Sequence, residues 1–275
     1  MSKAISAKRS EAVAKLLKES PLVILCGGHG TRLREETEWK PKPMVSVGDF
    51  PLLWHIMQYY ACFGVRRFVL CLGYKGQVIR DFFIAYHQRH SDLKIELGKN
   101  DVTYPGDGYT GDDWEIVLAN TGTDTHTGGR IAAVRKYLDS DNFLMTYGDG
   151  LADVDLNALV ECHLQNNKLG TVTAVQPTSR FAELIIENET VNSFSEKPLI
   201  TDGWVSGGFF VFKRDVLKYI HGDVVFEQEP LRELATAKQL SAYKHYGFWQ
   251  CVDTYRELMM VEKMWQSDQA PWKKW

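Results

Sequence analysis

The segment that decides the fold is Leu22-Val-Ile-Leu-Cys-Gly-Gly-His-Gly-Thr-Arg-Leu33. Its first five residues, Leu22–Cys26, are apolar and predict a short buried strand that runs directly into a glycine-rich turn. Gly27, Gly28 and Gly30 allow the backbone to turn tightly and to bring its N–H groups close to an anion. A strand that leads into an anion-binding loop indicates a sheet with a ligand site at the carboxyl ends of its strands.

Fixed positive charge follows this loop closely. Arg32 comes just after the last glycine, and Lys42 stands between Pro41 and Pro43, which restrict the backbone on both sides of it. A pre-positioned cation beside backbone donors suits a polyphosphate. We therefore expect this stretch to bind a nucleotide triphosphate, with chemistry at its phosphorus. The alternative is an ordinary strand-to-helix turn with surface charges.

Neither of the two best-known glycine loops fits this segment. A Rossmann dinucleotide loop needs a third glycine three residues after Gly30, and Leu33 stands there. A Walker loop needs Gly-Lys-Ser/Thr, and Thr31 and Arg32 follow Gly30 instead. A nicotinamide oxidoreductase is therefore a poor fit.

The composition excludes several classes of protein. The chain has 275 residues, 44% of them hydrophobic, enough for one large or two small domains with a full core. The net charge of −3 provides no basic excess to neutralise a nucleic acid. The five cysteines are scattered without a Cys-x-x-Cys pair, so we expect reduced core residues in a cytoplasmic protein. No apolar run approaches the length of a membrane span, so we expect no membrane partner.

Residues 1–20 are predicted to form a helical extension. Residues 3–19 carry five Lys or Arg and two Glu, which is unlike a secretion signal and too acidic for a transit peptide. We expect one apolar helix face, formed by Ile5, Ala12, Leu16 and Leu17. Such a helix would pack on the domain or on another subunit.

Strands and helices alternate through the first 180 residues. The predicted strands are Leu22–Cys26, Arg67–Leu72, Phe143–Tyr147 and Thr171–Gln176, and the predicted helices are Leu52–Phe63, Gly76–Tyr86 and a helix through His163 with Asp155 as its N-cap. Such alternation implies right-handed crossovers and a parallel sheet covered by helices on both faces. The glycine loop and Asp149 both follow predicted strands, so we expect them to share one edge of the sheet.

Residues 92–130 interrupt this alternation. They are polar and glycine-rich in their middle part, and we expect a β-arm insertion with strands at Val102–Tyr104 and Glu115–Leu118. Antiparallel strands and two closing helices are predicted further on, at Leu184–Ile186, Val191–Phe194, Gly208–Phe212, Glu229–Lys238 and Thr254–Gln266. No linker marks a domain boundary.

Two aspartates are candidate metal ligands. Asp149 follows an apolar run and is flanked by two glycines, and Asp253 ends a second apolar run before the last helix. A lone carboxylate is a poor Mg²⁺ site unless a second carboxylate and phosphate oxygens help. Asp253 taken alone is better explained as a helix N-cap, but its pairing with Asp149 favours a Mg²⁺ site.

Two further segments carry charge where a ligand is expected. Lys197 follows the strand that ends at Phe194, and it either binds the phosphate of the acceptor or is a solvated turn lysine. Thr127-Gly-Gly-Arg130 either contacts the base or ribose of the nucleotide or simply begins a helix.

These motifs, in this order, resemble those of the sugar-phosphate nucleotidyltransferases, and among them those that use CTP and glucose 1-phosphate. The resemblance covers nearly the whole chain after residue 20. It is carried by Gly27–Leu33, Lys40–Met44, Leu53–Met57, Leu72–Gly76, Thr127–Arg130, Tyr147–Gly150, Arg180-Phe181, Glu196–Pro198, Gly207–Phe210, Glu227–Leu231, Gly247–Gln250 and Ala270–Lys273.

The resemblance implies a Rossmann-like fold with a mixed, mostly parallel sheet, residues 21–275 forming one nucleotidyltransferase domain. It implies Mg²⁺-dependent transfer of CMP from CTP to a sugar 1-phosphate, giving a CDP-sugar and pyrophosphate, in a chain that forms homo-oligomers. The implied roles are catalysis for Arg32, Lys42 and Lys197, metal binding for Asp149 and Asp253, and nucleotide binding for Gly27, Gly28, Gly30, Thr31 and Arg130.

The acceptor side departs from the pattern of the family. Ala182 and Glu183 stand where the family tends to have Gly-Ala, and Ser206 replaces an asparagine before Gly207. We expect these four residues and Lys197 to contact the acceptor, where buried polar pairs discriminate between similar sugars. A different phosphorylated acceptor, UTP or dTTP in place of CTP, and a nucleotide-binding protein without turnover remain alternatives.

Overall fold

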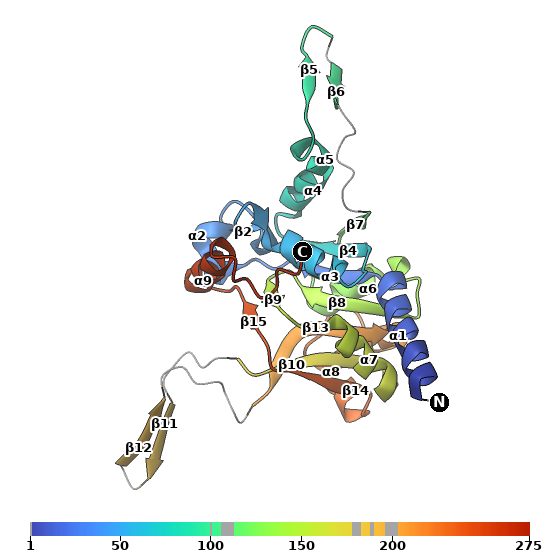
Figure 1. Ribbon diagram of the computed structural model, residues 1–275, viewed down its shortest axis with the longest axis vertical. Coiled ribbons are helices and arrows are strands. Elements are labelled where there is room, and N and C mark those ends of the chain that lie inside the picture. The colour runs from blue at the N-terminus through green and yellow to red at the C-terminus, as the bar shows by residue number, and fades with distance from the viewer. Residues whose placement is uncertain (1, 100, 106–112, 178–182, 188–189, 196–202) are drawn as a thin grey trace.

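A seven-stranded sheet lies at the centre of the computed structural model, which describes residues 2–99, 101–105, 113–177, 183–187, 190–195 and 203–275 (Figure 1). The strand order is β14-β10-β13-β8-β1-β4-β7. The strands are β1 (Leu22–Cys26), β4 (Arg67–Leu72), β7 (Glu115–Asn120), β8 (Asn142–Tyr147), β10 (Gly170–Val175), β13 (Val205–Lys213) and β14 (Leu240–His245). Within this sheet β13 is antiparallel to both of its neighbours and every other pairing is parallel. The prediction of a mixed, mostly parallel sheet is confirmed.

Both faces of the sheet are buried, as the apolar strands require. Along β1, Leu22 and Ile24 face one hydrophobic cluster, whereas Val23 and Leu25 face the other. The first cluster includes buried residues of five helices, α1 (Ser2–Glu19), α3 (Leu52–Ala61), α4 (Gly76–Ile84), α7 (Leu156–Asn166) and α9 (Tyr255–Gln266). The second includes residues of α6 (Thr127–Ala133) and α8 (Glu229–Thr236).

The predicted helices are present with shifted ends. The helix predicted over Gly76–Tyr86 is divided into α4 (Gly76–Ile84) and α5 (Tyr86–Arg89). Asp155 is the N-cap of α7, as predicted, since its Oδ1 accepts hydrogen bonds from the backbone N–H groups of Asn157 and Ala158 at 2.9 and 3.2 Å. The remaining short helical elements are α2 (Arg34–Thr37) and 3₁₀ turns at Thr31–Leu33, Lys42–Met44, Arg135–Tyr137 and Arg214–Tyr219.

The N-terminal helix α1 packs against α7, where Arg9 and Glu161 form an ion pair at 3.2 Å. Among the side chains of α1 that the structure describes, Val13, Leu16 and Leu17 are buried, and Ile5 of the predicted face lies outside them. Ala12 is exposed, so the predicted apolar face was wrong by one position. The 13, 16, 17 spacing is the i, i+3, i+4 pattern of a helix stripe.

The segment 92–130 contains two different structures. β5 (Lys94–Glu96) and β6 (Asp101–Thr103) form an antiparallel pair that projects away from the sheet at the top of Figure 1. The strand predicted at Glu115–Leu118 and expected in the arm instead forms β7 (Glu115–Asn120) and pairs in parallel with β4. This correction follows from edge pairing, since β4 offers a free row of backbone groups that β7 covers.

The other short strands complete the fold. β11 (Glu183–Glu187) and β12 (Thr190–Ser195) form the predicted antiparallel pair. β2 (Ser46–Val47) pairs with β3 (Phe50–Pro51), and β9 (Gly150–Ala152) pairs with β15 (Trp249–Cys251). The last pairing joins the segment after β8 to the segment before α9, and it positions the site described below.

The five cysteines are free, but they are not all in the core. Cys26 and Cys71 are buried as expected, whereas Cys62 is exposed. Cys62 follows α3 at a turn, outside the stripe that faces the sheet. Across the described ranges, we find no helix with the length and apolar character needed to span a membrane.

Candidate active site

A cavity of about 510 Å³ opens at the carboxyl edge of the sheet, beyond the ends of β1 and β8. Its lining comes from the glycine loop, the Lys42 turn, the segment before α6, the end of β8 and the start of α9. The lining residues include Gly27, Gly28, Gly30, Thr31, Arg32, Lys42, Thr123–Thr127, Arg130, Tyr147, Asp149, Val225 and Asp253. The edge on which the sequence placed the glycine loop and Asp149 therefore carries a cavity.

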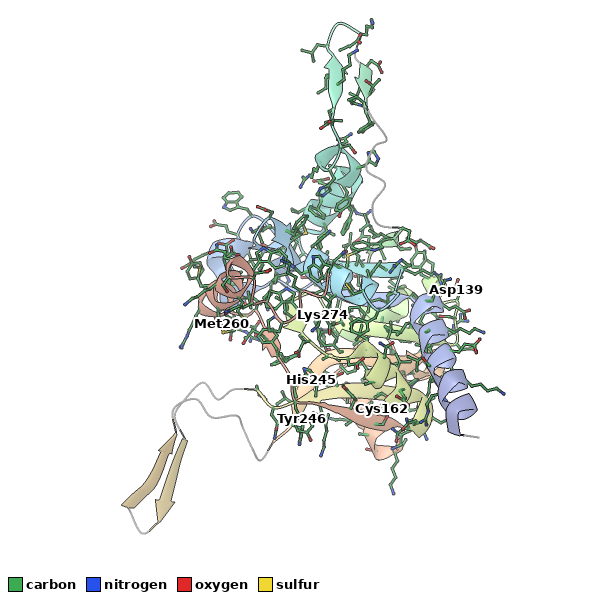
Figure 2. The ribbon with its side chains drawn as sticks, in the orientation of Figure 1. Asp139, Cys162, His245, Tyr246, Met260 and Lys274 are labelled. Carbon is green, nitrogen blue, oxygen red and sulfur yellow. The ribbon has the colours of Figure 1, made fainter. Side chains whose placement is uncertain are left out.

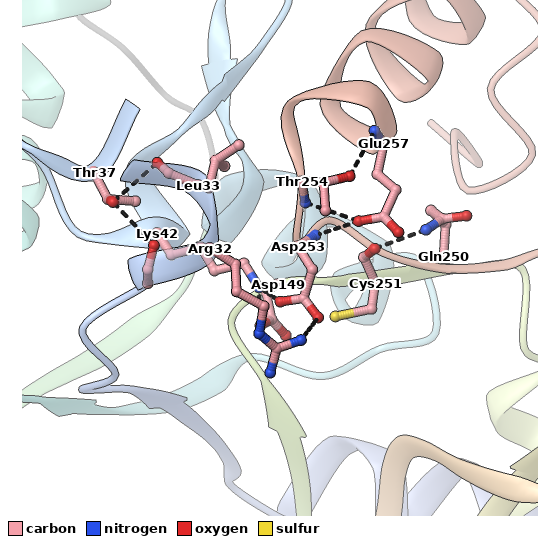
Figure 3. Close-up of polar contacts among 11 residues, drawn as sticks. Arg32, Leu33, Thr37, Lys42, Asp149, Gln250, Cys251, Asp253, Thr254 and Glu257 are labelled. Carbon is pink, nitrogen blue, oxygen red and sulfur yellow. Dashed lines mark hydrogen bonds and ion pairs between the residues drawn. The ribbon is translucent and has the colours of Figure 1, made fainter. Parts of the chain in front are cut away.

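Lys42 lies at the floor of this cavity with 9% of its side chain exposed. It begins a 3₁₀ turn after Pro41. Its Nζ donates a hydrogen bond to Asp149 Oδ2 at 2.7 Å and another to Asp253 Oδ1 (Figure 3). Burial alone lowers the pKa of Lys42, but the attraction of Asp149 and these hydrogen bonds outweigh burial and raise the pKa above its ordinary value.

Asp149 and Asp253 meet because β9 and β15 pair. Cys251 lies opposite Gly150 in that ladder, and the Val252 N–H donates to the Asp149 carbonyl at 2.9 Å. Arg32 adds a second cation, with Nη1 at 2.6 Å from Asp253 Oδ2. The predicted pairing of the two carboxylates is therefore present in the structure, although 104 positions separate them in the numbering, 253 minus 149.

The N-cap of α9 is Thr254, so Asp253 does not cap the helix. Thr254 Oγ1 accepts the Glu257 N–H at 3.3 Å, and Glu257 Oε2 accepts the N–H groups of Asp253 and Thr254, each at 2.8 Å. This capping box leaves the Asp253 carboxylate to the cavity (Figure 3). Burial raises the pKa of Asp253, but hydrogen bonding and attraction from Lys42 outweigh it, and the pKa lies below its usual value.

The glycine loop needs its glycines for two different reasons. Gly30 has φ +63°, in the left-handed region that favours glycine. A Cβ at Gly27 would overlap the guanidinium of Arg130, so a side chain there would have to displace Arg130 from its hydrogen bonds. The loop therefore presents bare backbone to the cavity, as an anion-binding loop requires.

Arg130, on α6, lines the cavity but donates to the protein itself. Its guanidinium bonds the Gly27 carbonyl at 3.2 Å, the Thr121 hydroxyl at 2.8 Å and the Gly122 carbonyl at 2.7 Å. Burial lowers the pKa of Arg130. Arg130 thus ties the glycine loop to the segment after β7, and its contact with a nucleotide stays a prediction.

Thr127 and Tyr147, which line the cavity, join Glu227 in a network that the sequence did not reveal. Thr127 Oγ1 donates to Glu227 Oε2 at 2.5 Å and accepts the Phe226 N–H at 2.8 Å. Tyr147 donates to the other oxygen of Glu227, and burial followed by the Glu227 charge raises the pKa of Tyr147. The only sequence signal for Glu227 was its place in the family-like segment Glu227–Leu231.

The predicted acceptor residues are placed less fully. Ala182 and Lys197 lie outside the described residues, and Glu183 begins β11 with its side chain outside them. Ser206 is exposed and Gly207 is buried at the start of β13, and the Gly207 carbonyl accepts the Trp249 indole N–H at 2.7 Å. Neither residue lines the 510 Å³ cavity, so their contact with an acceptor stays a prediction.

The residues around Lys42 fit a divalent cation. Asp149, Cys251 and Asp253 each offer one ligand atom, and these atoms lie within 4.8 Å of one another. The two carboxylates already hold an ammonium group between them, which shows that their oxygens converge on a cation. Carboxylate oxygens are the protein ligands that Mg²⁺ prefers. Cys251 was not predicted, although its i, i+2 spacing from Asp253 on an extended segment is a usable signal.

Comparison with known proteins identifies the family of the chain. The sequence profile described as "Nucleotidyl transferase" matches residues 22–250. The "Probable glucose-1-phosphate cytidylyltransferase" of Bacillus subtilis is 43% identical over 92% of this chain and 99% of its own length. The "Glucose-1-phosphate cytidylyltransferase" of Salmonella typhi is 43% identical over 92% of this chain and 98% of its own length.

Solved structures share the fold at lower identity. HddC from Yersinia pseudotuberculosis complexed with GMP-PN has a TM-score of 0.64 at 23% identity, covering 90% of this chain and 99% of its own. A UDP-glucose pyrophosphorylase complexed with UDP-glucose has a TM-score of 0.64 at 14% identity, with the same coverage of 90% and 99%. At these identities the likeness supports the architecture alone.

Proposed function

The chain belongs to the nucleotidyl transferase family, and we propose that it transfers CMP from CTP to glucose 1-phosphate, giving CDP-glucose and pyrophosphate. The relatives at 43% identity over nearly their whole length support this substrate pair. The observation that carries the chemistry is the contact of Lys42 with Asp149 and Asp253 beside the glycine loop. These groups combine phosphate-binding cations with metal-binding carboxylates in one cavity.

The transfer is a direct displacement at phosphorus. An oxygen of the sugar phosphate attacks the α-phosphorus of CTP, and the bond from that phosphorus to the bridging oxygen of the β-phosphate breaks, so pyrophosphate leaves. The attacking phosphate is already ionised near neutral pH, so no protein base is needed. The protein's task is to position the two phosphates and to neutralise their charge.

Arg32 and Lys42 carry out this neutralisation in the proposed mechanism. Both now contact the Asp253 carboxylate, and Lys42 also contacts Asp149. An arriving triphosphate offers the same cations a more highly charged partner, so both side chains exchange carboxylate for phosphate contacts. Gly27 and Gly28 add backbone N–H groups beside that position.

Members of this family generally use a divalent metal, and we propose Mg²⁺ held by Asp149 and Asp253. When bound, such an ion draws charge from the phosphate oxygens and orients the two groups. Lys42, released from the carboxylates, would then face the triphosphate as a second positive centre. The capping box formed by Thr254 and Glu257 keeps Asp253 directed to this point.

The remaining assignments complete the proposal. The nucleoside end of CTP lies toward Thr123–Thr127, which line the same cavity as the phosphate-binding cations but come from a different segment of the chain. Lys197 binds the phosphate of the acceptor, and Ala182, Glu183, Ser206 and Gly207 surround its sugar. We also propose a homo-oligomer that works in the cytoplasm.

The test is pyrophosphate release with Mg²⁺ across CTP, UTP and dTTP, and across a panel of sugar 1-phosphates with glucose first. The proposal expects turnover with CTP and glucose 1-phosphate above every other pair. Turnover with a different acceptor would move the assignment of the sugar, and CTP binding without release from any pair would leave a nucleotide-binding protein. Lys42→Ala is expected to lower kcat by about 10² or more, whereas Lys40→Ala, outside the cavity lining, keeps it.

A further inference from the structure

Glu227, in the segment just before α8, binds two hydroxyl groups of the cavity wall at once. Its Oε2 accepts a hydrogen bond from the Thr127 hydroxyl at 2.5 Å, and its Oε1 accepts one from the Tyr147 hydroxyl. Thr127 and Tyr147 line the cavity, whereas Glu227 itself is not among the lining residues. One carboxylate therefore brings together two hydroxyls that come from different elements, the start of α6 and the end of β8.

The carboxylate fixes the direction of both hydroxyl protons. An ionised carboxylate can only accept hydrogen bonds, so each hydroxyl turns its proton toward Glu227. The Thr127 oxygen also accepts the Phe226 N–H at 2.8 Å, which leaves it one lone pair. The Tyr147 phenol keeps its proton, because burial and then the Glu227 charge raise its pKa. Both oxygens can therefore accept a hydrogen bond from a ligand in the cavity, and neither can donate one.

The same segment also takes up backbone donors beside these hydroxyls. The His126 N–H donates to Asp223 Oδ1 at 2.8 Å, and the Gly128 N–H donates to the Val224 carbonyl at 2.9 Å. Both N–H groups lie at the start of α6, where the helix itself offers them no partner. Asp223–Glu227 thus accepts from two N–H groups and two hydroxyls, and this wall of the cavity presents oxygen lone pairs.

A wall of acceptors distinguishes one pyrimidine from the others. Cytosine carries an amino group at C4, with two N–H donors, whereas uracil and thymine carry a carbonyl oxygen there. A carbonyl oxygen placed against two oxygen acceptors leaves all of these lone pairs without a proton, and such unmade hydrogen bonds weaken binding. A site built to pair with a polar group of its substrate rejects the analogue that lacks this group.

We propose that Glu227 determines the choice of CTP over UTP and dTTP, because it fixes the protons of Thr127 and Tyr147 and leaves their oxygens to accept the 4-amino group of cytosine. Glu227 is a positioning residue in this scheme, since it acts through the two hydroxyls and does not touch the base. The inference rests on the proposed function in taking this cavity as the nucleotide site, with the nucleoside end toward Thr123–Thr127.

The test is the calorimetric affinity of the full chain for three nucleotides, with Mg²⁺ and without acceptor. They are CTP, UTP and the triphosphate of pyrimidin-2-one riboside, which has no substituent at C4. Glu227→Gln is the main variant, because the amide keeps the size of the side chain and one acceptor oxygen but replaces the other oxygen with an NH₂ donor. The hydroxyl that faces this NH₂ accepts its hydrogen bond and turns its own proton toward the cavity.

Two control variants make the same carboxylate-to-amide change elsewhere. Asp139→Asn changes a carboxylate that also accepts through both oxygens, from Arg67 at 2.8 and 2.9 Å. Asp139 lies near the end of α1 in Figure 2 and does not line the cavity. Glu233→Gln changes a carboxylate on α8, the helix that follows Glu227, and Glu233 lines a different cavity. Both control variants should bind the three nucleotides as the wild type does.

The wild type should bind CTP at least about 10-fold more tightly than the pyrimidin-2-one nucleotide, and UTP more weakly than either. In Glu227→Gln the ratio of the CTP affinity to the UTP affinity should fall by about 10-fold or more, with UTP bound at least as tightly as by the wild type. A residue that only supports the loop would instead weaken the binding of all three nucleotides by the same factor.

An unchanged affinity ratio in Glu227→Gln, or a changed ratio in either control variant, overturns the proposal. Should Glu227→Gln fail to fold by circular dichroism, Tyr147→Phe is the second test. Loss of this one acceptor should lower the preference for CTP over the pyrimidin-2-one nucleotide by about 5-fold, and an unchanged preference overturns the proposal as well.

The transferase assay with glucose 1-phosphate separates this proposal from the proposed function. Turnover of CTP together with an unchanged affinity ratio in Glu227→Gln refutes the role of Glu227 alone. The expected change of the ratio without turnover of any nucleotide refutes the proposed transfer alone.

Discussion

Lys42→Met is expected to lower the free energy of unfolding in the absence of metal and to raise the affinity of the protein for divalent cations. It should also remove most of the transferase activity. Lys42 Nζ lies 2.7 Å from Asp149 Oδ2 and also bonds Asp253, and the three side chains are 9%, 28% and 20% exposed. Methionine keeps much of the side-chain length and removes the charge. The substitution therefore leaves two carboxylates facing each other, with Arg32 as the remaining cation on one of them.

The magnitude follows from these distances. At 2.7 Å and an effective dielectric constant of ~20, the gross attraction between Lys42 and Asp149 is about 6 kcal/mol. Removing one partner of a buried ion pair costs about 3–5 kcal/mol, and the residual exposure together with Arg32 favours the lower figure, about 3 kcal/mol. For a chain of this size the melting temperature should fall by about 6–12 °C.

Binding of a divalent ion should restore the stability that the variant lacks, because the ion neutralises the two carboxylates. The ion should also bind more tightly to the variant, because it no longer has to displace the Lys42 ammonium. Calorimetric titration with Mn²⁺, without nucleotide, should show binding at least about 10-fold tighter in Lys42→Met than in the wild type. A 10-fold change in affinity corresponds to only about 1.4 kcal/mol of binding free energy. Mg²⁺ should raise the melting temperature of the variant more than that of the wild type. Pyrophosphate release should still fall by about 10² or more, because the cation toward the triphosphate is gone.

Lys40→Met is the matched control. Lys40 is two residues away and pairs with Glu36 at 3.2 Å, with both side chains about one-third exposed. Such a pair contributes about 0–1 kcal/mol, so the control should melt and bind Mn²⁺ as the wild type does. Equal melting temperatures and equal Mn²⁺ affinities for Lys42→Met and the wild type would refute the view that Lys42 occupies the cation site.

Three further predictions test the surroundings of the site. Gly27→Ala should lower the CTP affinity, measured by calorimetry, by about 10-fold or more, because the added methyl group overlaps the Arg130 guanidinium and displaces the loop. Equal CTP affinity in the variant and the wild type would contradict a role of Gly27 in nucleotide binding. Glu257→Ala should lower the free energy of unfolding in urea by about 1 kcal/mol and raise the Mg²⁺ concentration for half-maximal turnover. Glu257→Gln should restore both values, because glutamine, like glutamate, can accept the Asp253 N–H. Burial and the charge of Lys213 lower the pKa of His163 from 6.5 to about 4. Between these two pH values the unfolded chain binds a proton at this residue that the folded chain does not bind. The free energy of unfolding should therefore fall by about 3 kcal/mol as the pH drops from 6.5 to 4. His163→Gln should flatten this slope in urea titrations at several pH values, and an unchanged slope would exclude His163 as its source.

The local elements and the place of the ligand loop follow from patterns within short stretches of the sequence. The apolar run of β1, the glycines after it and the N-cap Asp155 are short-range patterns, and each is found where its pattern predicts. Alternating strands and helices were enough to predict a parallel sheet with its ligand edge at the carboxyl ends, because crossover geometry leaves few other arrangements. The apolar runs that precede Asp149 and Asp253 also made it possible to predict that these two aspartates lie together.

The way in which distant groups meet depends on the packing of the whole chain. Lys42 contacts Asp149 and Asp253 across 107 and 211 positions of sequence, and no local pattern states which of their oxygens face one another. Several other features depend on that packing. They are the pairing of β7 with β4, the capping of α9 by Thr254 instead of Asp253, the hydrogen bonds of Arg130 to other parts of the protein, and the approach of Cys251 to the carboxylates. The physical reason is one of range. Periodicity, caps and turns act within a few residues, whereas the geometry of a site is fixed by sheet register and side-chain packing between segments that the chain itself keeps far apart.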